Sequence, residues 1–134
     1  MTDKPSSLIG TGLSLSLTVK DVATSLRWYV DTLGFSVDHR NEADGVLRTV
    51  VLSAGAVRVL LNLDDGAKGW DRIKGAGLAL NFATEQDVDA IAARIKSAGY
   101  AIDSEPADRP WGARSFLVTD PDGFGWSISK WNRG

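Results

Sequence analysis

Few residues of this 134-residue chain have side chains suited to catalysis. The only imidazole is His39 and cysteine is absent, which excludes, within one chain, a two-histidine site, a catalytic thiol, a thiolate metal site and a disulfide. His39 has no visible partner for a Ser-His-Asp arrangement, and we interpret it as a surface histidine. The remaining guanidinium, amide, hydroxyl and indole groups suit hydrogen bonding and stacking to a ligand.

The charge and hydropathy of the sequence indicate which classes of partner the protein does not bind. Fifteen Lys and Arg against seventeen Asp and Glu leave a net charge of -2, so no basic excess exists for nucleic acid. Hydrophobic residues make up 43% and charged residues 24%, which is typical of a globular domain with a core. No apolar run approaches the roughly 20 residues of a membrane span, and the first residues lack the apolar stretch of a signal peptide. We therefore expect a cytoplasmic protein without nucleic-acid or membrane partners.

An internal repeat predicts the elements that position these side chains. Residues 13–19 alternate apolar and hydroxyl side chains, as a half-buried strand does. A helix over about 21–33 follows, with Gly34 as its C-terminal stop. Its expected buried face comprises Val22, Leu26, Tyr29, Val30 and Leu33. The same pattern returns 65 residues later, from Gly12 to Gly77 and from Gly34 to Gly99.

Both halves therefore predict strand, helix, strand, strand, strand. We expect a single α+β domain over 1–134, with module one at about 12–64 and module two at about 77–131. Turn-forming residues 64–69 link the modules, and their acidic residues Asp64 and Asp65 are expected to be solvated. In each module a helix covers one sheet face and leaves the polar face open. Two such half-cups side by side would enclose a cavity in a cupped, mostly antiparallel sheet.

Several stretches together resemble the vicinal oxygen chelate superfamily, which includes glyoxalase I, bleomycin resistance proteins and extradiol dioxygenases. They are Leu17-Thr18-Val19-Lys20-Asp21-Val22, Trp28-Tyr29-Val30-Asp31-Thr32-Leu33-Gly34-Phe35, residues 82–90, Pro110-Trp111-Gly112 and Asp120-Pro121-Asp122-Gly123. The last of these also predicts a tight turn before the final strand. The resemblance covers nearly the whole chain from Leu13 to Trp131, and it implies paired βαβββ modules and a homodimer.

The resemblance also implies where a divalent metal would be held, on strand faces that line the cup. The corresponding positions in this sequence are Ser14, Leu60, Ala79 and Ser127. A serine hydroxyl stays protonated at neutral pH and is a poor ligand, and leucine and alanine have no donor. We therefore expect no metal and no other cofactor. Metal-dependent glyoxalase or extradiol dioxygenase activity is not expected.

Strand parity predicts which side chains face the cup. Trp126 is expected on the core side of the last strand, and Trp28 of the first helix is also expected in the core. Small residues and a few polar ones are expected on the cup side of the strands. Among these, the candidate ligand-binding residues are Ser14, Arg58, Asn62, Asn81 and Ser127. Trp70 and Trp111 lie in expected loops, where each either packs or stacks on a planar ligand. Trp111 is favoured because its Pro-Trp-Gly segment resembles that of bleomycin resistance proteins.

Three functions remain open from the sequence. The favoured hypothesis is a metal-independent protein that binds or sequesters a small molecule, such as an aromatic antibiotic. The alternative is a metal-free isomerase or lyase in which Arg58 stabilises an oxyanion and a loop carboxylate, Glu105 or Asp108, acts as base. In the third hypothesis the cup is filled by its own loops, and the fold serves as an interaction module.

Overall fold

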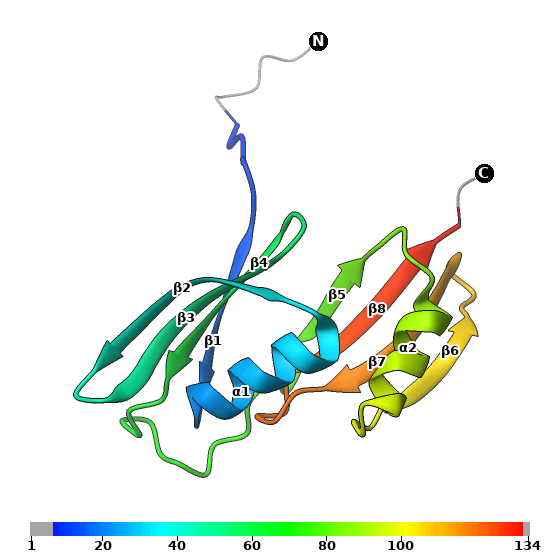
Figure 1. Ribbon diagram of the computed structural model, residues 1–134. Coiled ribbons are helices and arrows are strands. Elements are labelled where there is room, and N and C mark those ends of the chain that lie inside the picture. Colours follow the sequence, from blue (N-terminus) through cyan, green and yellow to red (C-terminus); the bar gives the residue numbers. More distant parts are fainter. Residues whose placement is uncertain (1–6, 133–134) are drawn as a thin grey trace.

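A computed structural model describes residues 7–132 and reveals two copies of the predicted order of elements (Figure 1). The first copy comprises β1 (Ser14–Val19), α1 (Val22–Trp28), the π-helical η1 (Tyr29–Leu33), β2 (Ser36–Ala43), β3 (Val46–Ala54) and β4 (Val57–Leu63). The second comprises β5 (Ala79–Ala83), α2 (Val88–Ser97), β6 (Ser104–Asp108), β7 (Ala113–Thr119) and β8 (Gly125–Trp131). No helix in this part of the chain is long and apolar enough to span a membrane.

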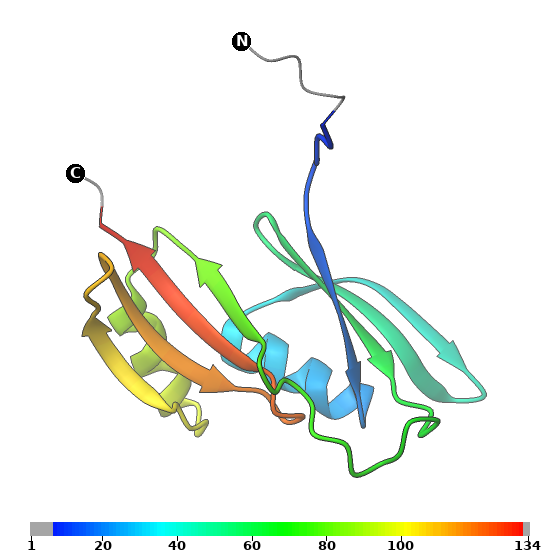
Figure 2. The same ribbon diagram turned by 180° about the vertical axis from the view of Figure 1, so that it is seen from behind.

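The strands form two four-stranded sheets with the same connectivity, in the orders β1-β4-β3-β2 and β5-β8-β7-β6. In each sheet the first and last strands of the module are parallel and the other neighbours are antiparallel. Figure 2 places β1 and β5 at the inner edges, where the two sheets lie side by side without pairing. The predicted α+β fold with two βαβββ modules is confirmed.

Along each strand, side chains point alternately to the core and to the open face of the sheet, as the alternating sequence predicts. In β1, Leu17 and Val19 are buried while Ser16 is exposed. In β5, Leu80 is buried while Asn81 is exposed. The predicted core positions of Trp28 and Trp126 are confirmed, since their exposed fractions are 8% and 2%.

The first helix begins where the sequence predicts but widens before it ends. Asp21 caps the helix by accepting a hydrogen bond from the Ala23 N–H. From Tyr29 the helix continues as the π-helical η1, and Gly34 closes it in the left-handed region at φ 79°. Val30 does not lie on the buried face as expected but is 37% exposed, because the buried side of the helix runs through Ser25, Trp28 and Thr32.

An aromatic cluster joins the two modules. Tyr29 and Phe35 of the first module pack edge-on against Trp126 of β8, at ring-centroid distances of 5.8 and 6.1 Å. Phe35 also contacts Phe82 of β5 at 6.1 Å. The end of the first helix is therefore buried between both sheets (Figure 1), whereas α2 packs on β6, β7 and β8 of its own sheet and touches η1.

A buried hydrogen-bond network lies beside these rings. The Tyr29 hydroxyl donates to Asp120 Oδ2 at 2.6 Å, and Trp126 Nε1 donates to the Tyr29 oxygen at 3.0 Å. The backbone N–H groups of Asp122 and Phe124 donate to Asp120 Oδ1. Burial raises the pKa of Asp120 and, with the adjacent carboxylate, that of Tyr29. The predicted tight turn at 120–123 is present, and it also fastens the modules together.

The linker is anchored to this turn by charge. Asp64 is only 6% exposed, and Lys74 Nζ lies 2.9 Å from its carboxylate and 3.3 Å from that of Asp122. Lys74 holds the pKa of Asp64 below its usual value. The expectation that Asp64 is a solvated turn acid is therefore wrong, because the linker folds back onto the β7–β8 turn.

Candidate functional site

The open face of the first sheet carries polar side chains in ordered rows. The strand register places Ser14, Arg58 and Ser53 in one row and Ser16, Leu60 and Val51 in the next. In the third row, Asn62 Nδ2 donates to the Ser16 hydroxyl of the adjacent row. Ser14, Arg58 and Asn62, all predicted site residues, therefore share one face.

A depression of about 460 Å³ lies over the row that contains Arg58. Ser14, Ser53 and Asp38 also line it. The Asp38 carboxylate accepts a hydrogen bond from the Ser53 hydroxyl at 3.1 Å. The alternation along the first and last strands of the modules predicts no carboxylate on this face. Asp38 reaches it from β2, where it lies two residues after Ser36, the partner of Ser53.

The open face of the second sheet is smaller and less polar. Asn81 and Ser127 are direct neighbours on β5 and β8, next to Leu117 of β7. The Ser127 hydroxyl lies 3.2 Å from that of Ser129. A depression of about 220 Å³ at this end is lined by Ala79, Ser127 and others. The structure therefore brings Asn81 and Ser127 together, but on a different sheet from Ser14, Arg58 and Asn62.

The four positions that correspond to metal ligands in the superfamily do not fit a divalent ion. Ser14 and Leu60 lie in different rows of the first sheet, while Ala79 and Ser127 lie in different rows of the second. Only the two hydroxyls offer an oxygen, and the Ser127 hydroxyl is already hydrogen-bonded to Ser129. Within residues 7–132 no group of three or more His, Asp or Glu side chains is arranged to hold a metal.

The two loop tryptophans lie at opposite ends of the second sheet. Trp70 covers Gly66 within the segment that links β4 to β5, and this segment packs on the β7–β8 turn at Gly123. Trp111 lies in the β6–β7 turn, where Gly112 accepts a hydrogen bond from the Asn132 N–H just after β8. Because β8 runs the length of the sheet between these ends, about 20 Å, the two rings cannot stack on one small ligand within a single chain.

The two carboxylates considered as loop bases are engaged on the helix side of the second sheet. Glu105 pairs with Lys96 of α2 at 2.9 Å, and Asp108 pairs with Arg114 at 3.2 Å. Both belong to β6 rather than to a loop. The expectation that one of them swings into the cup is not met by this arrangement.

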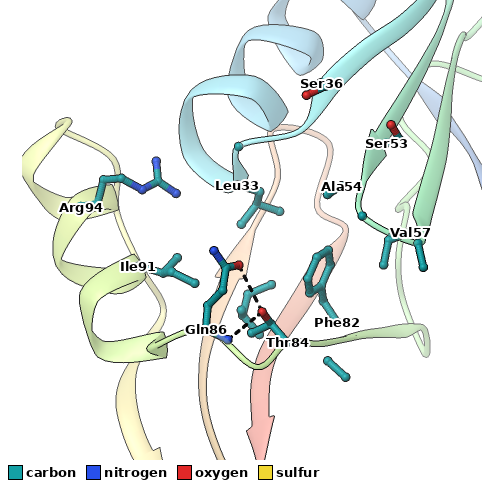
Figure 3. Close-up of a pocket in the computed structure, with 15 residues that line it drawn as sticks. Leu33, Ser36, Ser53, Ala54, Val57, Phe82, Thr84, Gln86, Ile91 and Arg94 are labelled. Carbon is teal, nitrogen blue, oxygen red and sulfur yellow. Dashed lines mark hydrogen bonds between the residues drawn. The ribbon is translucent and has the colours of Figure 1, made fainter.

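A cleft of about 560 Å³ lies between the modules and contains none of the predicted ligand-binding residues. Figure 3 shows Leu33, Val57, Phe82 and Ile91 around it, with Arg94 on one side. Arg94 donates to the backbone carbonyls of Asp31 and Thr32, so its guanidinium caps the end of η1. Sequence reasoning missed this cleft because neither module forms it alone.

Comparison with known proteins places this geometry in a family. The model of the glyoxalase/bleomycin resistance protein/dioxygenase superfamily matches residues 13–128. An uncharacterized protein of Mycobacterium tuberculosis is 30% identical over 124 residues, which cover 88% of this chain and 73% of that protein.

Two solved structures share the arrangement of both modules. TioX from Micromonospora sp. ML1 is 26% identical, with a TM-score of 0.75 over 92% of this chain and 100% of its own. A glyoxylase/bleomycin resistance protein/dioxygenase domain from Frankia sp. EAN1pec is 27% identical, with a TM-score of 0.74 over 96% of each chain. The chain belongs to the glyoxalase/bleomycin resistance protein/dioxygenase superfamily.

Proposed function

We propose that this protein is a cytoplasmic homodimer that binds and sequesters a small organic molecule on its open sheet faces without a metal. The binding residues in this proposal are Ser14, Arg58, Asn62, Trp70, Asn81, Trp111 and Ser127. The observation that carries it is the pair of open faces, each with hydroxyl and amide groups directed away from the core. Such faces offer hydrogen bonds that orient a ligand and leave room for its body.

The ligand class is suggested by another structural neighbour. TnmS3 from Streptomyces sp. CB03234, described as an antibiotic binding protein, is 24% identical, with a TM-score of 0.70 over 94% of this chain. An aromatic antibiotic matches the available chemistry, because the exposed indoles of Trp70 and Trp111 offer stacking surfaces. Each stacked aromatic pair contributes about 0.5–1.5 kcal/mol beyond the buried area.

Metal independence is supported by the donor set. Ser14 and Ser127 have hydroxyl side chains, and Leu60 and Ala79 have aliphatic ones. None of the four is an anionic or imidazole ligand. Binding in this proposal therefore depends on stacking, burial and neutral hydrogen bonds together with Arg58.

The homodimer is supported by what one chain leaves uncovered. Leu78, Leu117 and Trp131 are 48%, 39% and 46% exposed on or beside the second sheet. The inner edge strands β1 and β5 each lack a partner on one side. A second copy placed over these faces would turn each open sheet into one wall of an enclosed cup.

The experiment is a calorimetric titration of the wild-type protein with a panel of aromatic antibiotics, with and without EDTA. We expect one compound class to bind with an affinity that EDTA does not change. Trp111→Ala should weaken that binding by about tenfold or more, the equivalent of one lost stacking surface and its buried area. Trp28→Phe, a change in the core, serves as the matched control that leaves the affinity unchanged. Binding only after addition of a divalent ion would refute the metal-free site.

A second candidate function is favoured by the depression on the first sheet. Arg58 and Asp38 line it together, so a guanidinium for a developing oxyanion and a carboxylate base lie on one face. This is the metal-free isomerase or lyase. Turnover of a bound carbonyl compound in EDTA that is lost in both Arg58→Gln and Asp38→Asn would support catalysis. Unchanged turnover in either variant would remove that residue from the reaction, and binding without turnover would favour sequestration.

A further inference from the structure

The cleft between the modules lies on the helix side of the sheets, away from the two open faces. Its apolar walls come from both modules, and they are Leu33 of η1, Val57 of β4, Phe82 of β5 and Ile91 of α2. All four side chains are half-buried, and Ile128, which also lines the cleft, is only 3% exposed and belongs to the core. The cleft is therefore an uncovered part of the hydrophobic core.

The size of the cleft suits a small molecule. It measures about 560 Å³, within the range of roughly 300–1,000 Å³ that is typical of ligand pockets. The first module leaves this space unfilled because its β3–β4 turn has only two residues, 55–56. At the other end of the interface, the longer β7–β8 turn packs against the first helix through Asp120. The apolar walls therefore stay accessible to a ligand only at the end with the short turn.

The rim of the cleft presents hydrogen-bond donors. Thr84 Oγ1 accepts from the backbone N–H of Gln86 and donates to Gln86 Oε1, both at 3.1 Å (Figure 3). These two bonds orient the Gln86 amide, and its NH2 group bonds to no other group among residues 7–132. Arg94 also lines the cleft, and its terminal nitrogens donate to the carbonyls of Asp31 and Thr32. The Gln86 NH2 group is therefore a donor available to a ligand.

The charges around the cleft do not favour an anionic ligand. Of the described residues that line it, only Arg94 is charged, and none is a carboxylate. Carboxylates adjoin the rim, however, because Asp38 accepts a hydrogen bond from Ser53 of the lining and Asp31 bonds to Arg94 through its carbonyl. An anion would lose its hydration against the apolar walls and gain little from an arginine that already bonds to backbone oxygens. An uncharged ligand avoids both costs.

We propose that this cleft is a second binding site and that its ligand is an uncharged ring compound with a carbonyl oxygen. The ring lies between the apolar walls, and the oxygen accepts a hydrogen bond from the Gln86 NH2 group. A carbonyl oxygen is an acceptor only, which matches a rim with a free N–H donor. The bound ring contacts both modules and so stabilises the interface between them. The site is separate from the open faces and does not depend on the proposed function.

The first test follows methyl resonances of the wild-type protein during a titration with 2-acetylnaphthalene, a neutral planar ketone. We expect the methyl groups of Leu33, Val57 and Ile91 to shift in a saturable way. The absence of a saturable shift at all three would overturn the inference. The methyl groups of Leu60 and Leu117, on the open faces, report separately on the proposed function. Failure at the cleft therefore leaves the proposed function standing.

A variant that fills the cleft tests its location. Ile91→Trp places a larger side chain between the walls and should weaken binding of the ketone by about tenfold or more. Ile73→Trp, the matched control, makes the same change at a linker position that is 85% exposed and should leave the affinity within about twofold. Equal affinities in these two variants would overturn the cleft as the site.

The chemistry of the ligand is tested at the rim. Gln86→Leu removes the NH2 donor and should weaken binding of the ketone by about fivefold, as the loss of one neutral hydrogen bond implies. The wild-type protein should bind 2-naphthoate, which has the same ring system and a negative charge, at least about tenfold more weakly than the ketone. Binding of the acid as tight as that of the ketone would overturn the assignment of an uncharged ligand.

Discussion

The interface between the two modules has two ends. The internal repeat relates these ends to each other, but different interactions form them. Tyr29 and Arg94 occupy equivalent positions, 65 residues apart, and each reaches from its own helix into the other module. At the Tyr29 end the ring is fully buried and its hydroxyl is bonded to Asp120. At the Arg94 end the guanidinium borders an open cleft of about 560 Å³ (Figure 3).

The turns that face these two side chains explain the difference. Residues 120–124 connect β7 to β8, whereas only residues 55–56 connect β3 to β4. The longer turn carries Asp120 and Asp122, which accept hydrogen bonds from Tyr29, Ser25 and the Lys20 backbone. The shorter turn, with Gly55 and Ala56, has no side chain long enough to reach α2. The interface between the two modules is therefore closed only at the end where the longer, polar turn packs against the first helix.

The closed end offers the largest expected effect on stability. Asp120→Ala removes the acceptor of the Tyr29 hydroxyl and of two backbone N–H groups, all of them buried or partly buried. Leaving such donors without a partner should lower the free energy of unfolding by about 3 kcal/mol. Urea denaturation followed by tryptophan fluorescence measures this change.

The matched control for that prediction is Asp103→Ala, which removes an exposed carboxylate of the same module whose hydrogen bond is to Thr119. We expect it to cost less than about 1 kcal/mol, since water replaces the lost partner. Similar losses in both variants would contradict the view that the Asp120 network fastens the modules.

The open end should respond less to the loss of its bridging residue. Arg94→Gln removes the hydrogen bonds to the Thr32 and Asp31 carbonyls, at 3.0 and 3.3 Å, but one of these bonds is exposed and the other only partly buried. A loss of about 1 kcal/mol is expected in the same urea experiment. Arg48→Gln, at an exposed site of β3, should change the midpoint little. A loss as large as that of Asp120→Ala would mean that the two ends are equally important.

The repeated alternation made the fold predictable from the sequence. The alternation along each strand predicts that its apolar side faces the core, and the buried positions of Leu17, Val19 and Trp126 follow from it. The π-helical turn at 29–33 could not be predicted in this way, since helical spacing does not distinguish a one-residue widening. The exposure of Val30 was missed because the polar residues Ser25 and Thr32, rather than only apolar ones, lie on the buried side of the helix.

The open faces were predictable only where the strands are regular. Parity correctly grouped Ser14 with Arg58 and Asn81 with Ser127, because β1, β4, β5 and β8 keep an unbroken register. Asp38 was missed because β2 is exposed along its whole length and has no apolar alternation that would show which of its sides belongs to the open face. Its hydrogen bond comes from Ser53, 15 residues away, and no local pattern contains that pairing.

The smallest expected effect concerns how each helix is fastened to its own sheet. In the second module the first turn of α2 is bonded to β7 through Asp89 and Arg114, an exposed pair with no counterpart on α1 among the described residues. Arg114 holds the pKa of Asp89 below its usual value of 3.8. Because the folded pKa lies below the unfolded one, this pair stabilises the fold above about pH 4, and its contribution is lost as the pH falls through the folded pKa.

Asp89→Asn should therefore lower the urea midpoint slightly at pH 7, and its difference from the wild-type protein should shrink steadily as the pH is lowered below 3.8. Urea titrations at a series of pH values between 7 and 2.5, at constant low salt, measure this difference. Asp71→Asn, which removes an exposed carboxylate in the linker, controls for the loss of one negative charge. A pH-independent loss in Asp89→Asn would mean that the ion pair does not stabilise the contact between α2 and its sheet, and that it does not distinguish the two modules.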